Sequence, residues 1–398
     1  MGKYFKKKEP LSPPMGRPST GVGSSFEPSL IRRIMDYRFK HPYWGAKTIL
    51  AELVHSDGYL ATDLPSERTV ADLLKARCGV ESRAKHRPLD SPEPVLAHRA
   101  HECWQMDDKG VEFYAGVGHV GLINIKDNQS HVHTQAFGVP LAHTRCHPNI
   151  KDYQCALRLA FSEFGLPQRI QADHGSNFYE NKAQSPYPTP LHLWLLGLGV
   201  DLVWARIYRP TDQAKVERTH QTMHDQIRQT TPFKSWACFK GQLDKRRHCL
   251  NNTIPCASIG LPPLIAQPKA KHSGRYFNPF LETQMFESQR IKDYLHQKEW
   301  FRKVSDAKTI SIGGHVYYST NAKPKTELRI VFEKVQNNFM LYDDKELIDK
   351  IKIKGIQIED LVENDFINKI KHCQLELPIE WANVRSNTTF LHSKISTT

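Results

Sequence analysis

The sequence predicts a mixed α/β core, with a small helical module before it and a small β-rich module after it. Between about residues 103 and 229, short apolar runs with strand spacing alternate with segments of helical spacing. Residues 29–80 carry helical spacing alone, whereas residues 308–354 alternate apolar and polar side chains with the period of a strand. A chain of 398 residues is long enough for several such domains.

The N-terminal module, residues 29–80, is expected to contain three helices. The first ends near His41-Pro42, the second spans about 44–55, and the third opens at Pro65-Ser66 and stops before Gly79. This arrangement is typical of a helix-turn-helix DNA-binding domain, and a helical dimerisation or spacer module is the alternative. Arg68 and Lys75 occupy polar positions of the third helix, where they can contact DNA.

Two segments beside this module are too polar to fold alone. Residues 1–28 are rich in Lys, Pro, Ser and Gly, which predicts a flexible basic tail. Residues 81–102 form a basic linker whose Arg83, Lys85 and Arg87 can lie along a phosphate backbone, and an inert spacer is the alternative.

The core, residues 103–265, is expected to contain five strands and three helices. They are, in order, strands 103–109, 120–127 and 131–139, helix 151–164, strand 169–172, helix 191–198, strand 201–205 and helix 212–229. An antiparallel start followed by alternating helices and strands is the order of an RNase H-like mixed-sheet catalytic core.

The chain then changes from helix to sheet. A connecting segment, 266–303, is expected to end in a helix over about 288–303. Gly313-Gly314 and Asn337-Asn338 supply turns, so residues 304–362 are expected to form a small antiparallel β-barrel. The tail 363–398 shows no pattern to which a role can be given.

Composition favours a polyanionic partner and argues against several other classes. Lys and Arg outnumber Asp and Glu by 55 to 42, a formal net charge of +13, and such an excess favours nucleic acid. The eight cysteines form no Cys-x-x-Cys pair, which argues against a disulfide scaffold or a zinc ribbon. Because no apolar run reaches about 18 residues, we expect a soluble protein in a reducing cytoplasm.

Three acidic residues stand in settings that expose a carboxylate. Asp107 lies in the first strand of the core, Asp173 follows a strand directly before His174-Gly175, and Glu217 lies one turn into the last helix. Each acid alone is consistent with an ordinary role as a strand end, a turn former or an exposed helix charge. Together, in this order, they predict a metal-binding triad, with Asp108 as the alternative to Asp107.

A carboxylate triad is suited to phosphodiester chemistry. Two hard divalent cations about 4 Å apart activate the attacking oxygen and stabilise the leaving one, and carboxylate oxygens are their preferred ligands. Lys215, Arg218, Gln221 and His224 lie on the helix that carries Glu217 and are candidate DNA contacts. For Lys215 and Arg218, the alternative is that they are ordinary solvated charges on the surface of the helix.

Three sequence blocks carry the acids. They are Trp104-Gln105-Met106-Asp107-Asp108-Lys109-Gly110, Ala172-Asp173-His174-Gly175-Ser176-Asn177-Phe178 and Pro210-Thr211-Asp212-Gln213-Ala214-Lys215-Val216-Glu217-Arg218-Thr219-His220. These blocks resemble the signature blocks of bacterial insertion-sequence transposases with a retroviral-integrase-type DDE catalytic core (the integrase core domain family). The helices before the core and the β-rich stretch around 309–318 are similar to the modules that flank it in that family.

This resemblance implies a DNA transposase that cleaves element ends and transfers the strands into target DNA. It implies two Mg²⁺ or Mn²⁺ ions as cofactors, held by Asp107, Asp173 and Glu217. It also implies double-stranded DNA as partner, a homo-oligomer on that DNA, no membrane, and a location in the bacterial cytoplasm at the nucleoid. Two other functions stay open: an inactive, truncated or repurposed transposase that only binds DNA, and a metal-dependent RNase H-like nuclease.

Some positions depart from the family pattern. Asp173 and Glu217 are separated by 43 residues, which is longer than usual, and the excess is expected in the proline-rich stretch 186–190. His174 stands where Asn is usual, and Ala214 where Gly is usual. These departures concern activity rather than fold.

Overall fold

The computed structural model describes residues 26–78, 97–141, 145–181, 183–206, 210–229 and 231–362. The chain divides into two compact units, Met1–Pro88 with Arg228–Thr230, and Leu89–Ile227 with Thr231–Thr398. The tail 363–398, nearly all of the expected tail 1–28 and most of the linker lie outside the described residues. The candidate DNA contacts Arg83, Lys85 and Arg87 lie outside them too.

The first unit contains the three helices that the sequence predicts. They are α1 (Pro28–Lys40), α2 (Ala46–His55) and α3 (Glu67–Cys78). Their apolar stripes meet in one core, in which Ile34, Ile49 and Leu53 are fully buried. Ser66 caps α3, because its Oγ accepts a hydrogen bond from the Thr69 backbone N–H at 3.2 Å.

The connection between α2 and α3 differs from a standard helix-turn-helix turn. It spans residues 56–66 and contains a short 3₁₀ helix, Ala61–Asp63. A standard turn has only about three to four residues. The three helices are therefore as predicted, but the turn that would define the motif is replaced by a longer loop.

A five-stranded mixed sheet forms the centre of the second unit. Its strands are β1 (Cys103–Tyr114), β2 (Gly118–Asp127), β3 (His133–Pro140), β4 (Arg169–Ala172) and β5 (Asp201–Trp204). They lie in the order β3-β2-β1-β4-β5, with β1, β2 and β3 antiparallel and with β4 parallel to both β1 and β5. The five predicted strands are confirmed, and their arrangement is consistent with the predicted RNase H-like core.

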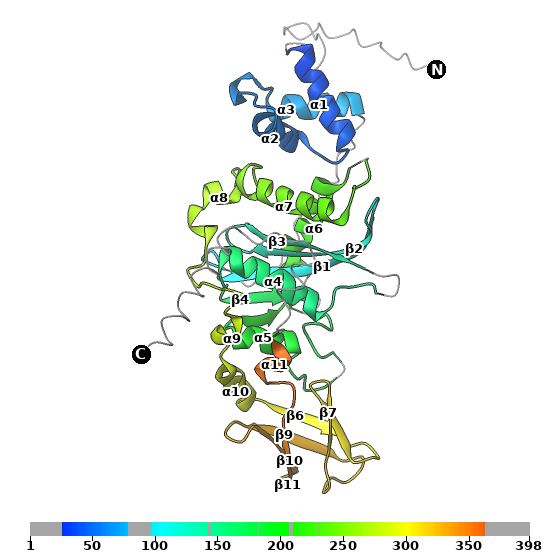
Figure 1. Cartoon of the computed structure of the whole chain (residues 1–398), viewed down its shortest axis with the longest axis vertical. Coiled ribbons are helices and arrows are strands. Elements are labelled where there is room, and N and C mark those ends of the chain that lie inside the picture. The colour runs from blue at the N-terminus through cyan, green and yellow to red at the C-terminus, as the bar shows by residue number, and fades with distance from the viewer. Residues whose placement is uncertain are drawn as a thin grey trace, which may run out of the picture. The chain divides into compact units, whose positions relative to one another are not determined.

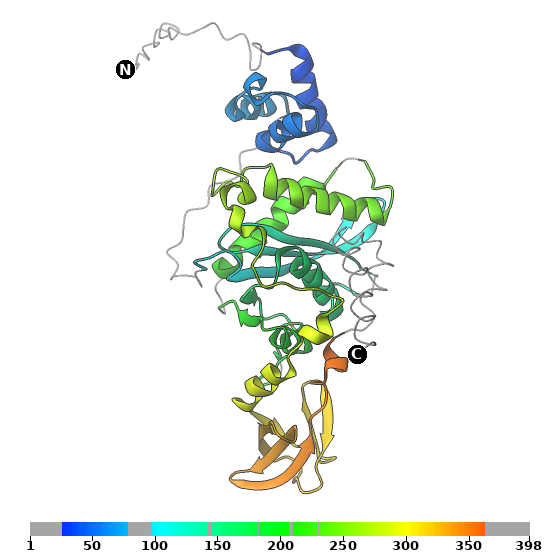
Figure 2. The same ribbon diagram turned by 60° about the vertical axis from the view of Figure 1, so that its left-hand side comes forward.

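Helices cover both faces of this sheet, as Figure 1 and Figure 2 show. α4 (Ile150–Phe164) and α5 (Pro190–Gly197) lie on one face, and α6 (Ala214–Ile227) and α7 (Trp236–Asn252) on the other. On the first face, Trp104 of β1 packs against Phe161 of α4, which stacks on Trp194 of α5. The sequence pattern predicts α4, α5 and α6, but not α7. None of the helices that the structure describes is long and apolar enough to cross a membrane.

Local sequence sets the ends of α4. The Asn149 side chain accepts a hydrogen bond from the Asp152 backbone N–H at 3.1 Å, and the Asp152 carboxylate accepts one from the Asn149 N–H at 2.8 Å. This reciprocal capping box satisfies two backbone donors that the first turn leaves free. Gly165, with φ of 76°, follows the last turn in a conformation that favours glycine.

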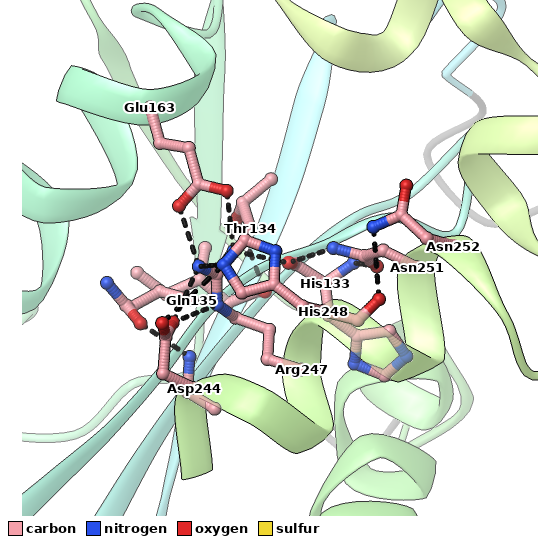
Figure 3. A network of polar contacts seen from close by, with 11 residues as sticks. His133, Thr134, Gln135, Glu163, Asp244, Arg247, His248, Asn251 and Asn252 are labelled. Carbon is pink, nitrogen blue, oxygen red and sulfur yellow. Dashed lines mark hydrogen bonds and ion pairs between the residues drawn. The ribbon is translucent and has the colours of Figure 1, made fainter. Parts of the chain in front are cut away.

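Buried polar contacts attach α7 to the core. Figure 3 shows Arg247 of α7 beside Glu163 of α4. The guanidinium donates to both Glu163 carboxylate oxygens, at 3.0 and 2.7 Å, and also to Asp244. The Asn251 side chain pairs with the backbone N–H and C=O of His133, at 2.8 and 2.9 Å. These contacts cover the edge strand β3, which a sheet must protect from pairing with other chains.

A buried ion pair fixes the connecting segment to the core. The chain from the end of the core through this segment contains α8 (Pro263–Ala266), a 3₁₀ helix (Pro268–Lys271), α9 (Glu282–Met285) and α10 (Ser288–His296). Arg158 of α4 donates to both carboxylate oxygens of Glu282, at 2.6 and 2.9 Å, and the Trp194 indole N–H donates to the same group at 2.6 Å. Three donors compensate for burying a carboxylate that is 2% exposed.

The C-terminal module is a pair of sheets rather than one closed barrel. Its strands are β6 (Glu299–Lys303), β7 (Thr309–Ile312), β8 (His315–Tyr318), β9 (Glu327–Glu333), β10 (Asn338–Asp343) and β11 (Glu346–Lys352), followed by α11 (Ile358–Leu361). One sheet has the order β11-β10-β9-β6, and β7 pairs with β8 separately. Gly313 and Gly314, with φ of 60° and 77°, form the predicted turn between β7 and β8.

The helix expected over 288–303 ends earlier. α10 stops at His296, and residues 299–303 form β6. Trp300 and Arg302 are buried, while the residues on either side of each are exposed. This alternation with a period of two suits a strand and not a helix, and it corrects the sequence-based expectation.

Candidate active site

Asp107 lies in the central strand β1 and faces α6. Side chains alternate along a strand, so Gln105 and Asp107 share one face while Asp108 lies on the other. The Gln105 Oε1 accepts a hydrogen bond at 3.2 Å from the backbone N–H of Val216, at the start of α6. Asp107 is therefore on the side of the sheet that is covered by the helix carrying Glu217.

Asp108 faces α4 and has partners there. One carboxylate oxygen accepts a hydrogen bond from the Tyr153 hydroxyl. The other lies 3.1 Å from the Nδ1 of His147. Both oxygens are thus engaged on the opposite face of β1 from Glu217, and this position favours Asp107 over Asp108 as the third member of the acidic group.

Asp173 stands at the carboxyl end of β4, where the chain turns. Its Oδ1 accepts a hydrogen bond from the Gly175 backbone N–H at 2.8 Å. The backbone N–H groups of Phe178 and Tyr179 both donate to the Gly175 carbonyl at 2.9 Å, so the segment folds back on itself directly after the acid. β4 is the parallel neighbour of β1, which brings the end of β4 next to Asp107.

Glu217 lies in the first turn of α6 and is exposed. One turn further on, the Nε2 of His220 lies 3.2 Å from the Oδ2 of Asp107. The other ring nitrogen of His220 lies 2.8 Å from the side-chain nitrogen of Asn124, which is the register partner of Asp107 in β2. The sequence did not single out His220 or Asn124. Their only local signals are a histidine one turn after Glu217 and an amide in an otherwise apolar strand.

Electrostatics connect the three acids. Burial raises the pKa of the Asp173 carboxyl, and the nearby charges of Asp107 and Asp108 raise it further, against the hydrogen bond from Gly175. Burial also raises the pKa of Glu217, and the charge of Asp107 adds to this effect. Asp107 is therefore the common neighbour of both other acids.

The donor set suits a hard divalent cation, since carboxylate oxygens are the ligands that Mg²⁺ and Mn²⁺ prefer. The acids interact as two pairs, Asp107 with Asp173 and Asp107 with Glu217. Across the described ranges, no three His, Cys, Asp or Glu side chains come close enough together to hold one metal ion. Asp107, Asp173 and Glu217 therefore fit such a cation by the chemistry of their donor atoms, and not by a closed three-ligand arrangement among the described residues.

A second polar group lies further along β1. Glu112 accepts hydrogen bonds from the Tyr114 hydroxyl at 2.6 Å and from the Nδ1 of His224 at 2.8 Å, and it pairs with Lys109. Burial alone would raise the pKa of Glu112, but the hydrogen bonds from His224, Lys109 and Tyr114 outweigh it and lower the pKa to about 2. The candidate DNA contact His224 thus has an internal carboxylate partner that the sequence did not indicate.

The other candidate DNA contacts differ in their exposure and in their hydrogen bonds within the protein. On α6, Arg218 is exposed, Gln221 donates to Asp225 at 2.7 Å, and the Lys215 ammonium donates to the Asn128 carbonyl at 2.6 Å. In the separate N-terminal unit, Arg68 and Lys75 are exposed and lie seven residues apart, which places them on the same flank of α3.

No family model matches this sequence. Among solved structures, the chain is similar to one in the simian T-cell lymphotropic virus intasome in complex with the PP2A regulatory subunit B56 gamma. That likeness has 14% identity and a TM-score of 0.36, and covers 73% of this chain and 91% of that one. The chain is also similar to the magnesium-bound HTLV-2 integrase catalytic core domain in its trimeric form (14% identity, TM-score 0.31, 44% of this chain and 99% of that one).

The BIV integrase catalytic core domain gives a further likeness, with 14% identity and a TM-score of 0.28 over 43% of this chain and 95% of that one. Retroviral integrase catalytic cores are thus among the structures that this chain resembles. With TM-scores below 0.5, these likenesses are too weak to assign a function, which has to be argued from the chain's own residues.

Proposed function

We propose that this protein is a DNA transposase or integrase of the DDE type, which cleaves at element ends and joins the strands to target DNA. One observation supports the proposal most. Asp107 from β1, Asp173 from the end of β4 and Glu217 from α6 are far apart in the sequence, yet Asp107 interacts electrostatically with both other acids. Carboxylates that interact in this way raise one another's pKa and repel when charged, and a bound cation would offset that repulsion.

In this proposal Asp107, Asp173 and Glu217 would hold two Mg²⁺ or Mn²⁺ ions. When bound, the cations supply activation of the attacking oxygen and charge neutralisation at the scissile phosphate. His220 fixes the orientation of Asp107 through its contact at 3.2 Å, and Asn124 fixes the ring of His220. Such partners behind a ligand set its direction and basicity.

Double-stranded DNA is the proposed partner. The net charge of +13 supplies general attraction to phosphate. Exposed cations on two elements are the proposed contacts, Arg68 and Lys75 on α3 and Arg218 on α6. We also propose a homo-oligomer assembled on that DNA, in which each subunit acts on one of the two element ends.

The proposal is tested by a strand-transfer assay. The protein is incubated with a library of flanked DNA ends and a target plasmid, in magnesium, manganese or chelator, and the joined products are sequenced. Joined ends that need the metal and disappear in the Glu217→Gln variant support a working transposase. Hydrolysis without joining points instead to a nuclease of the same fold.

A second function, DNA binding without catalysis, is favoured by one observation. Glu217 is exposed, and no three ligand side chains converge on one point among the residues that are described. In the same assay, specific retention of DNA ends without any metal-dependent product supports this second function and contradicts the first.

A further inference from the structure

The loop that begins at Asp173 is attached at its far end to the C-terminal module. We call residues 173–181 the catalytic loop and residues 183–189 the docking segment; the C-terminal module is the one described above, from β6 to α11. The catalytic loop has no regular secondary structure, so the backbone turn at Gly175 and individual side-chain contacts hold its shape. Asn181 contributes one, because its side chain donates to the His174 carbonyl at 2.6 Å.

Aromatic contacts with the core hold the middle of the catalytic loop. The Phe178 ring lies edge-on to Tyr153 of α4, with ring centroids 4.8 Å apart. The Trp204 indole N–H donates to the Phe178 carbonyl at 3.1 Å, and the Tyr179 ring packs edge-on against the same indole. The end of the loop, at Glu180, has a partner in the C-terminal module.

Arg302 of β6 holds that end. Its side chain is 9% exposed. The Nη2 donates to the Glu180 carboxylate at 2.8 Å, and the Nη1 donates to the backbone carbonyl of Ser185 at 2.7 Å and to its hydroxyl at 3.0 Å. The Nε donates to the Ser311 carbonyl at 3.1 Å. The same Glu180 oxygen accepts the backbone N–H of Tyr187 at 2.6 Å. Glu180 and Arg302 therefore join the catalytic loop, the docking segment and β6.

The docking segment contacts β6 through residues 185–187. The Trp300 indole N–H donates to the Pro186 carbonyl at 3.2 Å, and the Phe301 backbone N–H donates to the Ser185 hydroxyl at 2.7 Å. Tyr187 is buried against Trp300, with ring centroids 5.0 Å apart. The docking segment lies within the 43 residues between Asp173 and Glu217. It overlaps the proline-rich stretch 186–190, where the sequence analysis places the extra residues of this long spacing.

We propose that Arg302 is a positioning residue for Asp173, acting through Glu180. The C-terminal module thereby supports the active site within the same chain, beyond any contact that it makes with DNA. A carboxylate that must hold a cation has to be fixed to within about 0.5 Å by the residues behind it. Removing the guanidinium takes away the charged donor to Glu180, which then keeps the Tyr187 backbone N–H, and the donor to the Ser185 carbonyl. In a part-buried place the loss of such donors is costly.

The first test is hydrogen exchange in the metal-free protein. It compares Arg302→Gln and Glu180→Gln with Arg290→Gln, a control that removes an exposed arginine of α10 paired with Glu287. We expect the amides of the catalytic loop to exchange at least about tenfold faster in the first two variants, with no change in the control and with the β9–β10 amides still protected. Unchanged loop exchange, or equal acceleration throughout β9 and β10, would overturn the positioning role.

The second test, which rests on the proposed function, measures strand transfer against magnesium concentration. We expect Arg302→Gln to raise the half-saturating magnesium concentration about tenfold or more, Arg302→Lys to recover part of the loss, and binding of DNA ends to stay unchanged. A wild-type protein without product, combined with faster loop exchange in Arg302→Gln, refutes the transposase proposal and leaves the link from Arg302 to the loop standing. If the wild type is active and Arg302→Gln has the same half-saturating magnesium concentration, only the positioning role of Arg302 is refuted.

Discussion

His220 of α6 and Asp107 of β1 are joined across the interface between helix and sheet, with the Nε2 of the ring 3.2 Å from the Asp107 carboxylate. On its other side the ring receives the Asn124 side-chain amide, 2.8 Å from Nδ1. Since the amide donates to Nδ1, the Nε2 carries the proton and donates to Asp107. The central acid of the site is thus oriented by two residues that do not themselves belong to the acidic group.

We predict that His220→Gln lowers the rate of strand transfer by about 10- to 100-fold, as is typical for residues that orient a metal ligand. The loss should shrink at high magnesium, because a poorly oriented Asp107 still binds when the cation is in excess. Asn124→Ala should act through the same ring, so the double variant should cost no more than His220→Gln alone. Fully additive losses would show that the two side chains act independently.

The two neighbouring acids of β1 should behave differently. Asp107→Asn is expected to reduce strand transfer at least about a hundredfold, because it removes the carboxylate shared by both pairs. Asp108→Asn should retain product within about threefold, since Asp108 is engaged by Tyr153 and His147 on the other face of the strand. The measurement is product formation per folded protein, with folding checked by circular dichroism. The reverse pattern would transfer the ligand role to Asp108.

The free energy of unfolding of the metal-free protein should depend on pH because of the acidic group. The folded-state pKa of Asp173 is raised, chiefly by burial and then by Asp107, so the folded protein holds this proton to higher pH than the unfolded chain does. Between the ordinary pKa of 3.8 and the raised value, the folded state binds more protons. The free energy of unfolding due to this group therefore falls as the pH rises through that window.

Asp173→Asn removes this charge, and we predict that the metal-free variant is more stable than the wild type at pH 7, by about 1 kcal/mol or less because solvent screens a half-buried acid. Magnesium should raise the melting temperature of the wild type more than that of the variant. Thermal unfolding from pH 4 to 8, with and without magnesium, measures both effects. A variant that is less stable at pH 7 and responds equally to magnesium would remove Asp173 from the cation site.

Local patterns predicted the sheet and most helices but failed where polar residues face inward. α7 was missed because its buried side chains include Arg246, Arg247 and Asn251, which interrupt the apolar stripe that marks a helix. β6 was assigned to a helix because Arg302 stands at a buried strand position. In both cases the inward residue has a partner from a distant part of the chain, and no local spacing encodes that partner.

The same distinction between local patterns and distant contacts explains which residues of the candidate site could be predicted from the sequence. Asp107, Asp173 and Glu217 could be named because each follows a local signal, a strand alternation, a turn after a strand or a helix start. Their supporting residues could not, since the contact of His220 with Asp107 and that of Arg302 with Glu180 depend on how elements pack. The opening of the third helix at Ser66, by contrast, depends on only the next three residues and was predicted.

The exposed cations of α3 give the last prediction. Arg68 and Lys75 lie on one flank of that helix, whereas Arg77 lies nearly opposite and is also exposed. If the first flank contacts phosphate, Arg68→Glu or Lys75→Glu should weaken binding of DNA ends about tenfold at moderate salt, and each should lower the slope of log affinity against log salt by about one. Arg77→Glu makes the same change in net charge, so it should reproduce only the general loss of attraction. Titrations at several salt concentrations separate the two effects, and equal losses for all three variants would indicate that this helical module is a spacer.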